Sequence, residues 1–239
     1  MMKVSAFVVT CWMLVTVPVG WSSAAPTDKA AAAMQKGDFK TALKELDPLA
    51  AQGDPNAQFM LGMLHDAGKG VPQDPARAAM WYRKAAEQKH LIAQMFLGVF
   101  YHSGQGVKQD YKEAARWFRA PADSGYDHAQ FYLGWMYASG QGVKKNEDVA
   151  IQWLSRAAAQ KNTRAMGMLA TTQFSRHRDE QDLVDAYTWS HLAAEYDAIQ
   201  ASTSARGVIE QYCNEEQKKK GKKAMADWKR KWAKEGKTN

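Results

Sequence analysis

The hydrophobic and polar positions of the chain alternate as they do in helical hairpins. Ala57, Leu61 and Leu64 fall at i, i+4 and i+7, which places them on one face of a helix. A second apolar stripe follows Asp74-Pro75, an acidic N-cap residue with proline at the first helical position. Between the stripes stands Gly68-Lys69-Gly70-Val71, whose glycines tolerate positive φ. The pattern predicts two antiparallel helices joined by a glycine turn.

This hairpin recurs along the chain. The motif Ala57-Gln58-Phe59-Met60-Leu61-Gly62 returns at 93–98 and 129–134, and a worn copy stands at 165–170, each 36 residues after the last. The glycine turn returns at 104–107 and 140–143. Tryptophans keep the same step: Trp81, Trp117, Trp153 and Trp189. One hairpin cannot cover its own apolar faces, but stacked hairpins can, so the period predicts an all-α repeat stack.

Three positions depart from the period. Pro121 stands where other copies have alanine, and proline inside a helix costs about 3 kcal/mol, so we expect that helix to end or kink near Ala120. His65 replaces the tyrosine of the next two copies. The stretch from Ser175 to Asp179 replaces the glycine turn, which predicts a different path for the last connection.

The motifs Ala-Gln-x-x-Leu-Gly-x-x-Tyr, Gly-x-Gly-Val and Ala-x-x-Trp resemble the Sel-one-like repeat (SLR) family, a relative of the tetratricopeptide repeats, over about residues 54–196. The resemblance implies a right-handed α/α solenoid whose first helices line a concave surface, and protein binding rather than catalysis. The segments expected are a signal peptide (1–25), a tetratricopeptide-like hairpin (26–53), three repeats (54–89, 90–125, 126–161), a degenerate fourth repeat (162–197) and basic capping helices (198–239).

The first segment has the features of a secretory signal. Lys3 precedes an uncharged, mostly apolar run from Val4 to Val19, and small residues follow up to Ala25. The alternative is a single membrane anchor, for which the run is somewhat short. Cleavage predicts a periplasmic or secreted protein that keeps only Cys213 and therefore forms no internal disulfide.

Variable positions of the first helices carry the main functional hypothesis. With Leu61 and Leu64 facing the core, Met60 and Met63 are expected on the concave side, and their counterparts are also large and apolar. Aromatic and methionine-rich surfaces bind other chains adaptably. The predicted partner-binding row comprises Met60, Met63, Phe96, Val99, Tyr132 and Trp135. The alternative is that these side chains belong to the core between repeats.

The sequence contains no recognisable catalytic constellation. Its six histidines form no His-x-x-x-His pair, and its glycine turns miss the spacing of a phosphate-binding loop. The 36-residue period explains those glycines better. We therefore predict no enzyme activity, no cofactor and no metal site, with an unrecognised hydrolase as the weakest alternative.

The positive charge is confined to the tail. The formal net charge is +7 with pI about 9.3, yet residues 26–200 hold 20 basic and 20 acidic side chains, whereas residues 201–239 hold 11 Lys and Arg against five Asp and Glu. This distribution argues against nucleic-acid binding. It leaves an alternative function, which is binding to anionic lipid or acidic polysaccharide through the tail. In that case Trp228 and Trp232 would lie at a membrane surface. Otherwise these two tryptophans pack on the fourth repeat. The basic residues assigned to that alternative are Lys218, Lys219, Lys220, Lys222, Lys223, Lys229 and Arg230.

Overall fold

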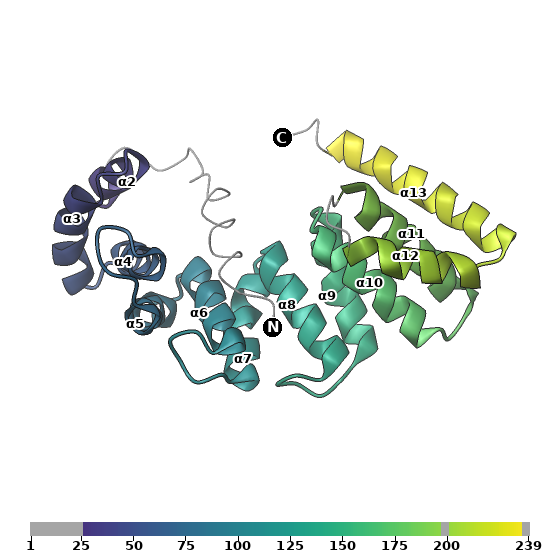
Figure 1. Ribbon diagram of the computed structural model, residues 1–239, viewed down its shortest axis with the longest axis horizontal. Helices are drawn as coiled ribbons and strands as arrows, with labels where there is room; N and C mark the ends of the chain where they lie inside the picture. The colour runs from purple at the N-terminus through teal and green to yellow at the C-terminus, as the bar shows by residue number, and fades with distance from the viewer. Residues whose placement is uncertain (1–25, 197–200, 236–239) are drawn as a thin grey trace. The chain divides into compact units, whose positions relative to one another are not determined.

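The computed structural model describes residues 26–196 and 201–235, and these fold into twelve α-helices without a strand (Figure 1). The predicted all-α repeat fold is confirmed. The chain divides into two compact units, Met1–Ala120 and Pro121–Asn239, with the boundary inside α7. The helices are α2 (Asp28–Gln35), α3 (Phe39–Ala51), α4 (Pro55–Ala67), α5 (Pro75–Glu87), α6 (Leu91–Ser103), α7 (Tyr111–Asp123), α8 (Asp127–Ser139), α9 (Glu147–Ala159), α10 (Thr163–Arg176), α11 (Glu180–Tyr196), α12 (Ala201–Tyr212) and α13 (Glu215–Glu235). The predicted signal segment lies outside the described residues.

Four helix starts, those of α3, α4, α5 and α7, have aspartate caps, whereas α6 is capped by His90. The carboxylate of Asp74 accepts the backbone N–H of Arg77 at 3.0 Å, and Asp54 accepts that of Ala57 at 2.8 Å. Each cap satisfies a donor that the first turn of a helix leaves open, which is worth about 1 kcal/mol. The predicted start at Asp74-Pro75 is therefore confirmed, and the first hairpin begins in the same way.

The glutamine of the repeat motif joins consecutive hairpins. Gln58, Gln94 and Gln130 are buried, and each side-chain amide donates to a carbonyl in the last turn of the preceding second helix. Those carbonyls have no partner within their own helix. The motif glutamine therefore completes the hydrogen bonding of the hairpin before it.

The two glycines of each turn are required for different structural reasons. Gly68, Gly104 and Gly140 end their helices in the left-handed conformation, with φ of 65°, 75° and 76°. The second glycine lies against the preceding hairpin: a Cβ on Gly106 would stand 2.2 Å from the carbonyl oxygen of Pro75. The turn thus needs glycine both for its backbone angles and for its close approach to a neighbour.

A further glycine lets the two helices of a hairpin pack closely. A Cβ on Gly62 would stand 2.6 Å from the ring of Tyr82, and one on Gly98 would stand 2.8 Å from the ring of Phe118. Both rings are completely buried. The missing side chain on the first helix therefore makes room for the largest core residue of the second.

Helix α7 does not end where the proline predicted. It runs to Asp123 and has the same 13 residues as α5 and α9. Pro121 is buried in its last turn, where only one helical hydrogen bond is lost, and its carbonyl still accepts the N–H of Tyr126 at 3.0 Å. The expected end at Ala120 is wrong because a proline so near the helix end interrupts little of the helix.

Unit 2 ends in two helices that cover the last hairpin, and α13 packs on α11 (Figure 1). Asn214 and Gln217 exchange side chain-to-backbone hydrogen bonds of 2.9 Å, which form a capping box at the start of α13. Gly221 of α13 lies against the buried ring of Tyr187, to which a Cβ would be 2.5 Å away. This close contact closes the apolar end of the repeats, as a solenoid cap must.

The fourth connection takes the different path that the sequence predicts. Helix α10 ends at Arg176, His177 adopts a left-handed φ of 34°, and α11 begins at Glu180. Three residues therefore replace the seven that join the helices of the other repeats. Ion pairs take the place of the glycine turn.

Candidate partner-binding surface

The four predicted row residues of unit 1 are half-buried. Met60 packs against the core cluster that contains Leu46 and Leu64, whereas Met63 and Phe96 pack against the next cluster along the chain. The Phe96 ring centroid lies 5.2 Å from that of Tyr82. Val99 is also half-buried. Each of these side chains is therefore partly packed in the core between helices and partly exposed.

The two row residues of unit 2, Tyr132 and Trp135, lie on the first helix α8. Their ring centroids are 6.4 Å apart in an edge-to-face arrangement, and both side chains are half-buried. Aromatic pairs of this geometry are held in place by their quadrupoles as well as by burial. Helix α8 therefore presents two large aromatic side chains in a fixed relation to each other.

Trp135 also lines a cleft of about 220 Å³ in unit 2. The cleft lies between the C-terminal parts of the first helices α8 and α10 and the segment that begins α9. This volume falls below the roughly 300 Å³ at which small-molecule sites begin, and it suits one inserted side chain. Its lining residues are Trp135, Ala138, Ser139, Lys145, Glu147, Met168, Thr171, Thr172 and Ser175.

Most of the hydroxyl groups of the cleft donate to their own helices. Ser139 donates to the carbonyl of Trp135 at 2.9 Å, and Thr171 and Thr172 both donate to the carbonyl of Met168, at 2.9 and 2.8 Å. A hydroxyl whose proton is used in this way retains only acceptor lone pairs. Across the mouth, the Lys145 ammonium lies 2.8 Å from the Glu147 carboxylate.

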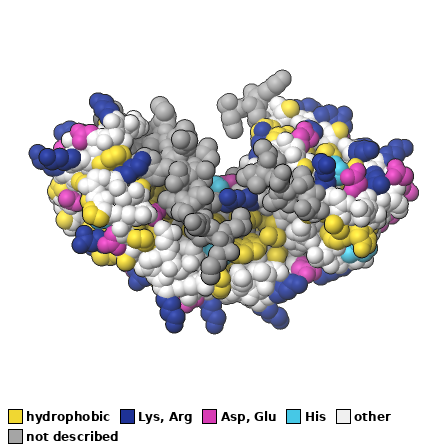
Figure 2. Space-filling model, viewed as in Figure 1, with side chains coloured by type: hydrophobic (Ala, Val, Ile, Leu, Met, Phe, Trp, Pro, Cys, Tyr) yellow, Lys and Arg dark blue, Asp and Glu magenta, His cyan; other side chains and the backbone are white. Residues whose placement is uncertain are grey.

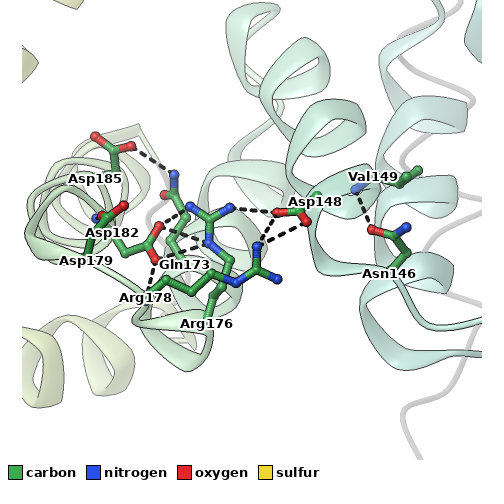
Figure 3. Close-up of polar contacts among 9 residues, drawn as sticks. All are labelled: Asn146, Asp148, Val149, Gln173, Arg176, Arg178, Asp179, Asp182 and Asp185. Carbon is green, nitrogen blue, oxygen red and sulfur yellow. Dashed lines mark hydrogen bonds and ion pairs between the residues drawn. The ribbon is translucent and has the colours of Figure 1, made fainter.

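A network of four charged side chains connects the end of α10 and the fourth connection to α9 and α11 (Figure 3). Arg176 bonds Asp182 through two of its nitrogens and Asp148 at 3.0 Å, and Arg178 bonds Asp148 at 3.1 Å. Asp182 is only 1% exposed. Burial by itself would raise the pKa of Asp182, but the hydrogen bonds from Arg176 and from the backbone N–H of Arg178 outweigh it and lower the pKa. The network fixes the short fourth connection to α9.

Unit 1 contains a buried acid that the sequence analysis did not single out. Asp66 is 2% exposed and accepts a hydrogen bond of 2.9 Å from the side chain of Gln105, in the glycine turn of the next repeat. Its second oxygen has no hydrogen-bond partner among the described residues. Burial raises the pKa of Asp66 to about 6, against the opposing effect of the Gln105 hydrogen bond.

Comparison with known proteins accounts for the repeats. The Sel1 repeat family matches residues 55–90, 91–126 and 127–162. The chain therefore contains three Sel1 repeats. It is similar to c5321, a protective antigen present in uropathogenic Escherichia coli strains displaying an SLR fold (28% identity, 90% of this chain and 48% of that chain covered, TM-score 0.75). It is also similar to a Sel1 repeat protein from Oxalobacter formigenes (26% identity, 89% and 84% covered, TM-score 0.68). The chain thus spans about half the length of c5321, and no curated protein matches it.

Sel1 repeats generally mediate protein–protein interaction and typically form non-catalytic scaffolds. In the described part of this Sel1-repeat protein, no three His, Cys, Asp or Glu side chains gather where they could hold a metal ion. None of its described helices combines the length and apolar character needed to cross a bilayer.

The described basic side chains in the tail of the Sel1-repeat protein fall into two groups, those that form ion pairs and those that do not. Lys218, Lys220, Lys229 and Arg230 each form an ion pair with a carboxylate. Figure 2 shows basic side chains interspersed with acidic ones in this region. Within the described residues, no ion pair involves three of the exposed lysines of α13. These are Lys219, Lys222 and Lys223.

The tail tryptophans pack on the repeats. The indole N–H of Trp232 donates to the carbonyl of Ala159 at 3.2 Å, and the Lys161 ammonium stands over its ring at 3.1 Å from the centroid. The Trp228 ring lies 6.1 Å from that of Trp189. Trp228 therefore packs on the fourth repeat, as one of the two placements had it, whereas Trp232 contacts the end of the third repeat.

Proposed function

We propose that this Sel1-repeat protein is an exported, non-catalytic scaffold of the cell envelope. It binds a segment of a protein partner on the surface formed by its first helices. The basis is the family, whose repeats mediate protein interaction, together with the secretory features of residues 1–25. The likeness to c5321, a protective antigen, is in keeping with an exported protein.

The observation that carries the proposal is the arrangement of α8. Its paired rings, Tyr132 and Trp135, are half-buried rather than enclosed, and Trp135 forms part of a cleft that α10 completes. Large aromatic side chains next to a pocket are the commonest anchors of protein interfaces. An extended segment of a partner would contact this surface through alternate side chains, and an amphipathic helix would contact it through its apolar face.

The double variant Tyr132→Ser/Trp135→Ser tests the proposal. We expect it to lose crosslinked partners from the native envelope while its helical circular dichroism and unfolding midpoint stay near those of the wild type. Met80→Ser is the matched control, because Met80 is 44% exposed on a second helix and lies outside the row. Global unfolding of the double variant would assign these rings to the core. Capture equal to that of the control would refute the proposal.

A second candidate function rests on Lys219, Lys222 and Lys223, exposed lysines of α13 that pair with no described carboxylate. Such a face attracts anionic surfaces, and screening weakens that attraction as salt rises. The test is co-sedimentation with vesicles containing phosphatidylglycerol, compared with vesicles of phosphatidylcholine alone. Lys219→Gln/Lys222→Gln/Lys223→Gln should abolish binding that 0.5 M salt also abolishes. Binding that survives both changes would exclude this candidate.

A further inference from the structure

We infer that the cleft beside Trp135 is a cation-accepting subsite, which receives an arginine or lysine side chain of the bound partner segment. This inference rests on the proposed function and specifies the chemistry of the partner. It concerns unit 2 alone, and its evidence is the hydrogen-bonding capacity, the charge and the size of the cleft.

The hydrogen bonding of the walls favours a donor. Three of the four lining hydroxyls, those of Ser139, Thr171 and Thr172, already give their protons to helix carbonyls. They can therefore only accept hydrogen bonds from a ligand. A guanidinium or an ammonium carries donors and no acceptor, so it matches these walls, whereas a carboxylate or a phosphate does not.

Two of the three helix ends at the cleft, the C-terminal ends of α8 and α10, add negative potential, which the N-terminal end of α9 opposes in part. Ser139 is the last residue of α8, and Thr172 and Ser175 lie in the last turns of α10. The C-terminal ends of helices carry partial negative charge and favour cations nearby. Glu147, at the first position of α9, adds a full carboxylate whose side chain is 24% exposed.

The cleft already holds a cation at its mouth. The Lys145 ammonium lies 2.8 Å from Glu147, and the Lys145 side chain is 60% exposed. An exposed pair of this kind contributes little stability, so an incoming cation exchanges with it readily. An arginine gains more than Lys145 does, because its planar group can bond the carboxylate through two nitrogens and stack on an aromatic side chain such as Trp135.

The size of the cleft matches this occupant. A volume of about 220 Å³ accommodates one long side chain but is small for a complete cofactor. The rest of the partner segment would then lie along α8, where Tyr132 contacts Trp135. The subsite thereby selects segments that carry a basic residue next to apolar ones.

Two peptides that differ only in charge test the inference: acetyl-Leu-Arg-Leu-amide and the same peptide with citrulline in place of arginine. We expect the arginine peptide to bind residues 26–239 about tenfold more tightly in NMR titrations, with the largest amide shifts at Thr171 and Ser175. Glu147→Gln should abolish the preference for arginine. Lys145→Met should strengthen arginine binding, because it removes the resident cation.

Glu113→Gln is the matched control, since Glu113 is an acid in the first turn of α7 that pairs with Arg116 instead of lining the cleft. It should leave both peptides unchanged. Equal affinities for the two peptides, absence of binding, or weaker arginine binding by Lys145→Met would each overturn the inference. If envelope capture depends on Tyr132 and Trp135 but the peptides do not discriminate, the proposed function stands without the subsite. If the peptides discriminate but capture does not depend on the two rings, the subsite stands and the proposed function fails.

Discussion

Replacing Asp66 by asparagine is expected to remove a pH-dependent cost from unit 1. Burial raises the pKa of this carboxyl from 3.8 to about 6, a difference that corresponds to about 3 kcal/mol at neutral pH. A carboxyl with a higher pKa in the folded state binds its proton more tightly when folded. The wild type therefore gains stability as pH falls from about 7 towards 4, and the cost is fully present above pH 7.

The variant Asp66→Asn keeps an oxygen that can accept the hydrogen bond of Gln105, but it carries no charge at any pH. Its amide nitrogen enters a site where the second oxygen of Asp66 has no described partner, and this adds a constant cost of about 1–3 kcal/mol. The quantity that tests the argument is therefore the pH dependence of the difference in unfolding free energy between the variant and the wild type. The free energy of unfolding of the variant minus that of the wild type should rise by about 2 kcal/mol between pH 4 and pH 7, because part of the cost is already present at pH 4.

Urea unfolding of residues 26–239 at half-unit steps from pH 4 to pH 7.5 measures this difference. Burial lowers the pKa of His65, His90 and His102, so both proteins lose stability in acid for a separate reason. Subtracting the free energy of unfolding of the wild type from that of the variant cancels this contribution, because both proteins have the same histidines. A difference that stays flat across this range would refute the argument that Asp66 is charged and buried at neutral pH.

Two further predictions use matched pairs of substitutions. Gly98→Ala should destabilise the protein by about 1–3 kcal/mol because its Cβ would overlap the Phe118 ring, whereas Gly167→Ala, with nothing within 4 Å, should stabilise α10 by about 1 kcal/mol; thermal melts compare the two. Gains from both substitutions would contradict the close packing in the hairpin. Asp182→Asn should cost about 3 kcal/mol in urea unfolding because it leaves a partly buried arginine without its main partner, whereas Asp148→Asn, at an exposed site, should change little. Equal effects would show that the buried carboxylate does not hold the fourth connection.

Features that depend on neighbours in sequence were predictable. The turn glycines, the Asp74-Pro75 start and the Asn214–Gln217 box all follow from local backbone chemistry, and the structure has them where the pattern places them. The 36-residue step then identified the hairpins, because each copy repeats the same local signals.

Features that depend on distant residues were not predictable in the same way. Asp66 is bonded by Gln105, 39 residues away, and only the return of the next turn brings them together. The sequence pattern assigns Lys220 and Lys229 to binding of an anionic surface, but these two lysines reach Glu180 and Glu195 on α11. Helix α12 formed as expected, yet only Ile209 of its apolar residues Val208, Ile209 and Tyr212 is buried.

The same limit applies to the candidate surface. The row of large apolar residues could be read from the period, and so could the aromatic pair on α8. The cleft could not, because Lys145 and Glu147 reach it from the turn and from α9, and neither belongs to the row.

The hydrogen bond of the motif glutamine to the hairpin before it has a consequence for how such a chain can change length. A copied segment of 36 residues within residues 54–161 brings its own glutamine and turn glycines, and the preceding hairpin offers the acceptor carbonyl that the glutamine needs. Gene duplication can therefore lengthen the array there without inventing a new interface. Beyond residue 162 it cannot, because Met166 stands in place of the glutamine and the arginine–aspartate network replaces the turn. The array can therefore gain repeats in its interior but not at its C-terminal end.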